Sequence, residues 1–104
     1  MAIPFIPIEL DKPRRLRFGL GAMVEFEQLT GIKLASIGDE MSFEVCAKLL
    51  WIMLKQDEPE LTLEQIYKLV DEHSNSVAEV ISLVTEAVTA AMGNAPKNVG
   101  KPKA

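Results

Sequence analysis

The residue types that most often carry out chemistry are scarce in this chain, which has one histidine and one cysteine among its 104 residues. His73 lies near the predicted end of a helix, where an imidazole suits the helix dipole, and no nucleophile is placed to use it as a general base. Cys46 has apolar neighbours and no nearby base that favours its thiolate. One histidine and one cysteine are too few for a structural zinc site. We therefore expect no enzyme activity and no metal site.

Two short motifs resemble ligand-binding loops without completing one. Gly19-Leu20-Gly21 precedes a predicted helix, but neither the third glycine of a dinucleotide loop nor the Gly-Lys-Ser/Thr of a phosphate loop follows. The acidic cluster Asp57, Glu58 and Glu60 lacks the alternating oxygen ligands and the central glycine of an EF-hand loop. A strand-to-helix corner and an acidic helix N-terminus explain these two motifs. We therefore expect no bound cofactor.

The remaining candidates for function are residues suited to protein contacts. A basic cluster near the N-terminus contains Lys12, Arg14, Arg15 and Arg17. It is either the solvated face of a hairpin, paired with acidic residues of the same hairpin, or a surface that docks onto an acidic partner. Trp51 and Met53 leave a similar choice between the core and a binding surface, because Trp, Met and Arg are all enriched at protein interfaces.

The charge distribution argues against nucleic acid as a partner. The net charge is −4, but residues 19–95 carry 4 lysines and 13 acidic residues, a net charge of −9. Residues 1–18 carry +2 and residues 96–104 carry +3. A general nucleic-acid binder needs a basic face that displaces phosphate counterions. One basic hairpin on an acidic body does not supply that face.

The apolar segments do not indicate a membrane protein. The longest apolar run, residues 43–54, is interrupted by Glu44 and Lys48 and is shorter than the roughly 20 residues that a membrane-spanning helix needs. The N-terminus has no positive start and contains Pro4 and Pro7, so it does not resemble a secretory signal. A single cysteine cannot form an internal disulfide, which fits a reducing cytosol.

Apolar and polar residues alternate on both sides of a loop between residues 5 and 18, which predicts a β-hairpin. The register that keeps every apolar side chain on one face pairs Leu10 with Leu16, Ile8 with Phe18, Glu9 with Arg17 and Asp11 with Arg15. This register leaves residues 12–14 as a three-residue loop, and its two charged pairs have opposite signs, which stabilises a sheet.

Helical spacing of apolar residues predicts four helices after the hairpin, at about residues 20–30, 42–56, 62–73 and 76–92. Ser42 is the expected N-cap of the second helix. Thr62 with Gln65, and Ser76 with Glu79, predict capping boxes for the third and fourth helices.

Glycines and a connector complete the predicted arrangement. Gly31 and Gly93 are expected to end the first and last helices. Residues 32–41 are expected to form a connector with a turn at Gly38-Asp39, whose apolar residues pack against the core. They are Ile32, Leu34 and Ile37.

The helix at 42–56 carries its polar residues on one narrow stripe, so it is either central to the core or exposed to a partner. The tail at 94–104 has no periodicity and little apolar surface, which predicts disorder. The fold class is therefore predicted to be α+β and mostly α. We expect one small globular domain over residues 1–93 and a flexible tail over residues 94–104.

Several of these features together resemble one protein family. They are the turn Asp11-Lys12-Pro13-Arg14, the motif Gly-x-x-Ala-Met-x-x-Phe-Glu-x-x-Thr-Gly over residues 19–31, the stretch from Leu50-Trp51 to Leu61-Thr62-x-Glu64, and the Ala-rich last helix. This combination resembles the small tail assembly chaperones of long-tailed bacteriophages, over most of residues 5–93.

The resemblance implies a binding function in the cytoplasm of a bacterial host. Such chaperones coat the tape-measure protein, recruit tail-tube subunits around it and are absent from the finished particle. In this family a ribosomal frameshift often adds a second domain that meets the tube protein. The tail after Gly93 is a suitable place for that join, because Pro96-Lys97-Asn98 and Gly100-Lys101 are residues that slippery runs of A or G can encode.

The expected contacts follow from the same interpretation. A helix-in-groove contact that uses Trp51 and Met53 would cover an apolar stripe of the tape measure. The basic hairpin, through Arg14, Arg15 and Arg17, would meet the acidic body of a neighbouring copy. No nucleic acid and no membrane are expected as partners.

Two alternatives remain open from the sequence. The first is a structural tail-completion or head–tail protein that stays in the particle. The second is a small DNA-binding regulator that uses the helix pair at 62–92. The last helix, over residues 77–92, contains no lysine or arginine, which disfavours the second alternative.

Overall fold

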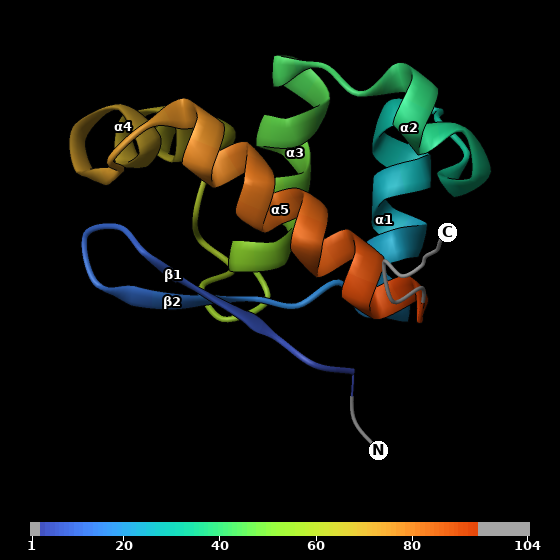
Figure 1. Ribbon diagram of the computed structural model, residues 1–104, viewed down its shortest axis with the longest axis horizontal. Coiled ribbons are helices and arrows are strands. Elements are labelled where there is room, and N and C mark those ends of the chain that lie inside the picture. The colour runs from blue at the N-terminus through green and yellow to red at the C-terminus, as the bar shows by residue number, and fades with distance from the viewer. Residues whose placement is uncertain (1–2, 94–104) are drawn as a thin grey trace, which may run out of the picture.

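The computed structural model describes residues 3–93, which form a hairpin followed by helices (Figure 1). The elements, in chain order, are β1 (Ile6–Glu9), β2 (Pro13–Leu16), α1 (Leu20–Thr30), a 3₁₀ helix (Leu34–Ser36), α2 (Ile37–Glu40), α3 (Phe43–Leu54), α4 (Leu63–His73) and α5 (Val77–Met92). The predicted α+β, mostly α fold class is confirmed, and each of the four predicted helices is present within two residues of its expected bounds. The predicted tail at 94–104 lies outside the described residues.

The hairpin forms where it was predicted, but the predicted register is wrong. Leu16 lies opposite Ile6, not opposite Leu10, and residues 10–12 form the loop in place of residues 12–14. The partner of Leu16 has moved by four residues, an even number, so the same side chains still face the core. Ile8 and Phe18 are buried although they are not paired with each other.

Loop chemistry accounts for the observed register. Asp11 accepts hydrogen bonds from Nε and Nη2 of Arg14 at 2.9 and 3.0 Å, and the backbone N–H of Leu10 donates to the carbonyl of Lys12 at 3.2 Å. A bidentate arginine–carboxylate pair is strong and directional. It fixes Asp11 next to Arg14, so the predicted pair of Asp11 with Arg15 does not form.

Capping residues fix the helix ends largely as predicted. The hydroxyl of Ser42 accepts from the N–H of Val45 at 3.1 Å, and Thr62 with Gln65 forms a complete capping box. The last helix has half of its predicted box, because Ser76 accepts from the N–H of Glu79 and the described residues show no return bond. Two left-handed glycines end helices as expected, at Gly31 (φ 74°) and Gly93 (φ 77°).

The predicted connector at 32–41 contains more helix than expected. It contains the 3₁₀ helix and α2, and Gly38 lies inside α2 instead of forming a turn. The carboxylate of Glu27 accepts from the N–H of Leu34 at 3.0 Å, which satisfies a backbone donor at the start of the 3₁₀ helix. The apolar residues expected to pack against the core do so; they are Ile32, Leu34 and Ile37.

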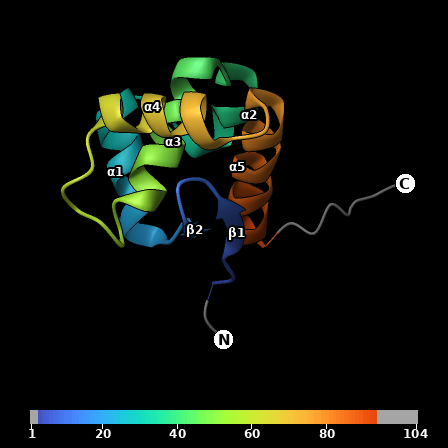
Figure 2. The same ribbon diagram turned by 90° about the vertical axis from the view of Figure 1, so that its left-hand side faces the viewer.

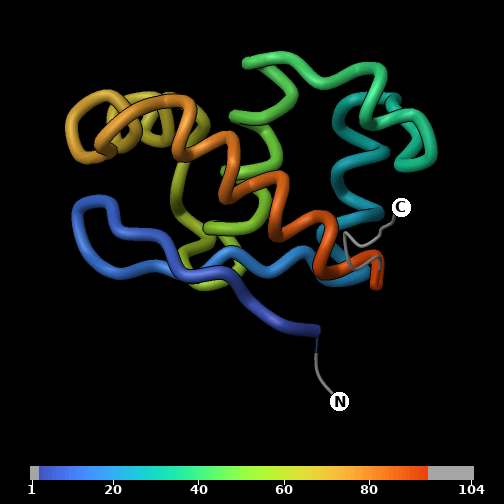
Figure 3. Tube along the Cα trace, in the orientation of Figure 1, coloured from blue at the N-terminus to red at the C-terminus, as the bar shows by residue number. Residues whose placement is uncertain are grey.

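Helix α3 is the centre of the core. It packs against α1, α4, α5 and β2, and seven of its twelve residues are buried. In Figure 3, α3 lies between α4 at one end of the molecule and the α1–α2 region at the other. The hairpin lies along one side of the helices (Figure 2), with β2 against α3 and β1 against α5. The near-continuous apolar surface of α3 therefore reflects its central position.

Candidate protein-binding site

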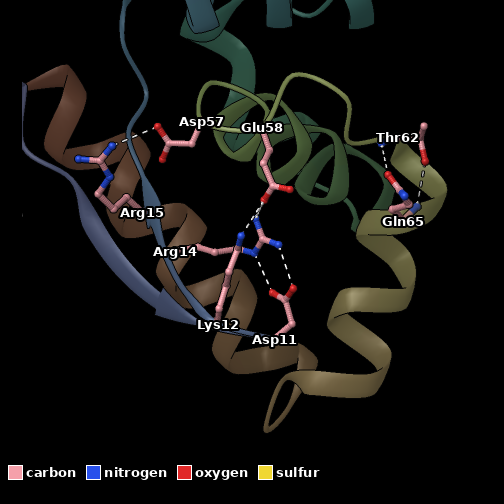
Figure 4. A network of polar contacts seen from close by, with 8 residues as sticks. All are labelled: Asp11, Lys12, Arg14, Arg15, Asp57, Glu58, Thr62 and Gln65. Atoms are coloured by element: carbon pink, nitrogen blue, oxygen red, sulfur yellow. Dashed lines mark hydrogen bonds and ion pairs between the residues drawn. The ribbon is translucent and has the colours of Figure 1, made fainter.

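The basic cluster of the hairpin is largely neutralised within its own chain. Arg14 lies opposite Ile8 on the core-facing side of the hairpin, and its side chain is 8% exposed. Its guanidinium contacts both Asp11 and Glu58, a residue of the loop between α3 and α4 (Figure 4). These hydrogen bonds hold the pKa of both carboxyls below their ordinary values. Arg14 is therefore a bridge between the hairpin and the α3–α4 loop.

The neighbouring cations of the cluster use the same acidic loop. Lys12 Nζ lies 3.5 Å from Glu58 Oε1, and Arg15 Nη2 lies 3.1 Å from Asp57 Oδ1. The guanidinium carbon of Arg15 is also 5.6 Å from the ring centroid of Phe5. Within residues 3–93, Arg17 is the member of the cluster with no ion pair. Docking of this hairpin onto a neighbouring copy stays a prediction, and it now depends chiefly on Arg17.

Trp51 and Met53 do not form a common surface. Met53 is buried in the core, so a partner does not reach it in this conformation. Trp51 is half-buried, and its indole N–H donates to the carbonyl of Leu61 at 2.8 Å. The ammonium of Lys55 lies 4.6 Å from the Trp51 ring centroid and pairs with Glu25 of α1. Trp51 thus joins α3 to the loop before α4.

A groove that sequence reasoning missed opens where α3, α4 and the start of α5 meet. Its volume is about 660 Å³. Its floor is made of buried apolar residues from all three helices: Cys46, Leu50, Ile66 and Val80. Its rim carries large apolar side chains that remain in contact with water. These are Phe43 at 77%, Tyr67 at 46% and Val77 at 47% exposure.

Local structure explains why these three side chains are exposed. Phe43 is the first residue of α3, directly after the N-cap Ser42, where the helix has not yet entered the core. Tyr67 follows the buried Ile66 on α4, so it lies at the edge of the packed face. Val77 is the first residue of α5. The three-residue link between α4 and α5 brings it to the rim.

Leu29 is another large apolar residue that remains exposed. It is in the last turn of α1, just before the chain turns at Gly31.

The sequence contained one usable signal for the groove. An aromatic residue next to an N-cap, as at Phe43, is at the end of a helix and is less constrained by packing than one in its middle.

The groove offers mainly shape and apolar surface. Burial raises the pKa of the Cys46 thiol to about 11, so the floor holds a neutral, unreactive thiol near neutral pH. The charged residues of the lining are Glu44, which pairs with Lys48 at 3.1 Å, and Asp71. Among residues 3–93, no group of three or more potential metal ligands is close enough to hold an ion. This arrangement suits the binding of another apolar surface.

Within the same residues, no helix has the length and apolar character needed to cross a bilayer. Comparison with family models, with curated proteins and with solved structures finds no match to this chain.

Proposed function

We propose that this protein is a tail assembly chaperone of a long-tailed bacteriophage or prophage, acting in the cytoplasm of the bacterial host. It binds the tape-measure protein and helps to recruit tail-tube subunits during tail assembly, and it leaves before the particle is complete. The sequence resemblance over most of residues 5–93 suggests this role. The observation that carries it in the structure is the open apolar groove with Phe43, Tyr67 and Val77 on its rim.

Exposed apolar surface on a small domain needs an explanation. Contiguous apolar patches rimmed by polar residues are typical of protein-binding sites. A tape-measure protein is long and helical, and its apolar stripes face water until the tail tube encloses them. A groove of this kind can cover one turn or more of such a stripe. The contact is assigned to the rim of the groove in place of Met53, which is buried.

Co-expression with the tape-measure protein of the same phage tests the proposal. We expect the tape measure to remain soluble and to co-purify with this chain, and to aggregate when expressed alone. A tape measure that is equally soluble without this chain, or that never co-purifies with it, would contradict the proposal. An unrelated acidic helical protein of similar size is the control for general effects of co-expression.

Purified particles separate a chaperone from a structural tail component. We expect an antibody against the hairpin to detect this chain in infected cells and to give no signal in finished phage particles. A signal in particles, at a fixed ratio to the tail-tube protein, would contradict the chaperone function and favour the structural tail-completion or head–tail alternative.

Recruitment of tail-tube subunits is assigned mainly to a frameshifted longer product. The join would lie in residues 94–104, outside the described part of the chain. Expression of the gene with its native downstream DNA should give a minor longer band beside the short one on an immunoblot. A single short band would contradict the assignment of tube binding to such an extension.

A further inference from the structure

We propose that the groove between α3, α4 and α5 binds an amphipathic helix of another protein that carries lysine or arginine beside its apolar stripe. The inference deepens the proposed function, on which it rests for the natural source of that helix. It adds the site, the conformation of the bound segment and its charge, and synthetic peptides can test each of these without the tape measure.

The apolar half of the inference follows from the lining. The floor is apolar, and three rim residues from three different helices expose large parts of their side chains. The volume of about 660 Å³ is within the range typical of binding clefts, and several bulky side chains can enter it. A helix presents such side chains on one face at spacings of three, four and seven residues. Each anchor would remove apolar surface from water on both partners.

The charge of the partner follows from the two charged residues of the lining. Both Glu44 and Asp71 are carboxylates. Glu44 shares its charge with Lys48, whereas Asp71 has no ion pair among residues 3–93. A helix with acidic flanks would meet like charge at the rim, and one with basic flanks would find a carboxylate that has no cation of its own. Complementary charge of this kind selects the partner and speeds association.

A second copy of this chain does not fit the same description. Helix α1 has exposed apolar residues at Leu20 and Val24, so its face is a candidate occupant of a neighbour's groove. However, α1 carries Glu25 and Glu27 and has no lysine or arginine, and α5 also lacks basic residues. An acidic helix placed next to Asp71 would be repelled. The occupant is therefore assigned to a different protein.

The first experiment compares two labelled peptides of equal helicity and identical apolar face, one with lysine flanks and one with glutamate flanks. Fluorescence anisotropy should show the lysine peptide binding about tenfold more tightly, with the difference shrinking as salt is raised. Asp71→Lys should remove or invert this preference. Glu72→Lys is the matched control, because it changes the net charge equally on the next residue of α4, which is exposed and does not line the groove.

The second experiment tests the apolar anchor. Phe43→Ser should weaken binding of the lysine peptide by about tenfold or more, because a bound helix would bury this large aromatic side chain of the rim. Leu20→Ser is the matched control. Leu20 is also the first residue of its helix and is 73% exposed, but it does not line the groove. We expect Leu20→Ser to bind the peptide like the parent protein, and circular dichroism should show that both variants are folded.

Each other outcome contradicts the inference in an identifiable way. Equal affinity for the two peptides, unchanged by Asp71→Lys, would contradict the inference that the bound helix carries basic residues. Peptide binding that is unchanged by Phe43→Ser would contradict the assignment of the groove as the binding site. Sedimentation that shows a dimer of the parent protein, dissociated by Phe43→Ser, would make a second copy the occupant. If the Phe43→Ser variant still keeps the tape measure soluble, the proposed function stands and the assignment of the groove fails. If the parent protein does not keep the tape measure soluble, the proposed function fails independently of the groove.

Discussion

Side chains are paired at the junction between the hairpin and the α3–α4 loop, whereas large side chains remain exposed at the groove between α3, α4 and α5. At the junction, Arg14 and Arg15 meet Asp57 and Glu58 of the α3–α4 loop, so most of the local charge is paired inside the chain. At the groove, apolar side chains such as Phe43 have no partner in the fold and remain in water. The charged residues that suggested a docking surface in the sequence are mostly paired inside the chain. Phe43, on the helix for which the sequence left both a core and a partner contact open, is exposed.

The comparison shows which kind of surface indicates a partner. Exposed ion pairs contribute little to stability, and in this chain a loop that is distant in sequence pairs most of the basic cluster. Exposed bulky apolar residues are unfavourable in water unless something covers them. Binding is therefore expected at the groove, and structural effects are expected at the junction. Measurements of stability separate the two regions.

Ile66→Ala should give the largest loss of stability. Ile66 is fully buried, and it belongs both to the core and to the groove floor. Removing its branched side chain should lower the free energy of unfolding by about 3 kcal/mol, as is typical of buried isoleucine-to-alanine changes. Urea unfolding followed by circular dichroism measures the change. Ile66→Val, which removes one methyl group, should lose about 1 kcal/mol, and equal losses in the two variants would show that the site does not depend on packing.

Arg14→Met should lower the free energy of unfolding by about 2 kcal/mol, because it removes charge-assisted hydrogen bonds to two carboxylates from a side chain that is itself buried. Arg17→Met removes the same charge from a neighbouring position with no ion pair among residues 3–93, so its effect should stay within about 0.5 kcal/mol. Similar losses in both variants would mean that general charge, and not the bridge, matters at the junction.

The same bridge should be sensitive to acid. Arg14 lowers the pKa of Asp11 and Glu58 from ordinary values of 3.8 and 4.5. Their stabilising effect is fully present above those ordinary values and is lost as pH falls through the lower values of the folded state. The stability difference between the parent protein and Arg14→Met should therefore shrink below about pH 4. A difference that is constant from neutral to acidic pH would contradict the ion-paired geometry.

Cys46, which lies in the groove floor, should lower the stability of the folded protein at alkaline pH. Its thiol pKa is raised by burial from 9.0 to about 11. Between these values the unfolded chain loses the proton and the folded chain keeps it, so stability falls as pH rises. The parent protein should lose about 1 kcal/mol more than Cys46→Ala between neutral pH and about pH 10. Parallel losses in the two proteins would indicate that the thiol is not desolvated.

Alternation in the sequence was sufficient to predict the hairpin but not its register. Shifting the partner of Leu16 from Leu10 to Ile6 keeps all apolar residues on the same face, so the hydrophobic pattern is satisfied by both pairings. The choice between them depends on the loop, where Asp11 holds Arg14. Side-chain chemistry of the turn, and not periodicity, therefore decided the register of the hairpin.

The helices were predictable because their caps are local in sequence. The N-caps Ser42 and Thr62 and the glycines at 31 and 93 all act within a few residues. The groove was not predictable in this way, because it depends on the angles between α3, α4 and α5. Periodicity places Ile66 on a buried face, but it does not tell whether a neighbouring helix also covers Tyr67.

Phe43→Ser should have a small effect on stability, comparable with that of Arg17→Met, although it is expected to have a large effect on binding. With 77% of the residue exposed, the side chain gives up little buried surface when it is shortened. Its free energy of unfolding should stay within about 0.5 kcal/mol of the parent protein. The ratio of the two effects is the informative quantity. Arg14→Met should reduce stability and leave peptide affinity unchanged, and Phe43→Ser should do the reverse. If Phe43→Ser instead lost more than about 1 kcal/mol, Phe43 would support the fold as Ile66 does, and the contrast between a closed junction and an open groove would no longer hold.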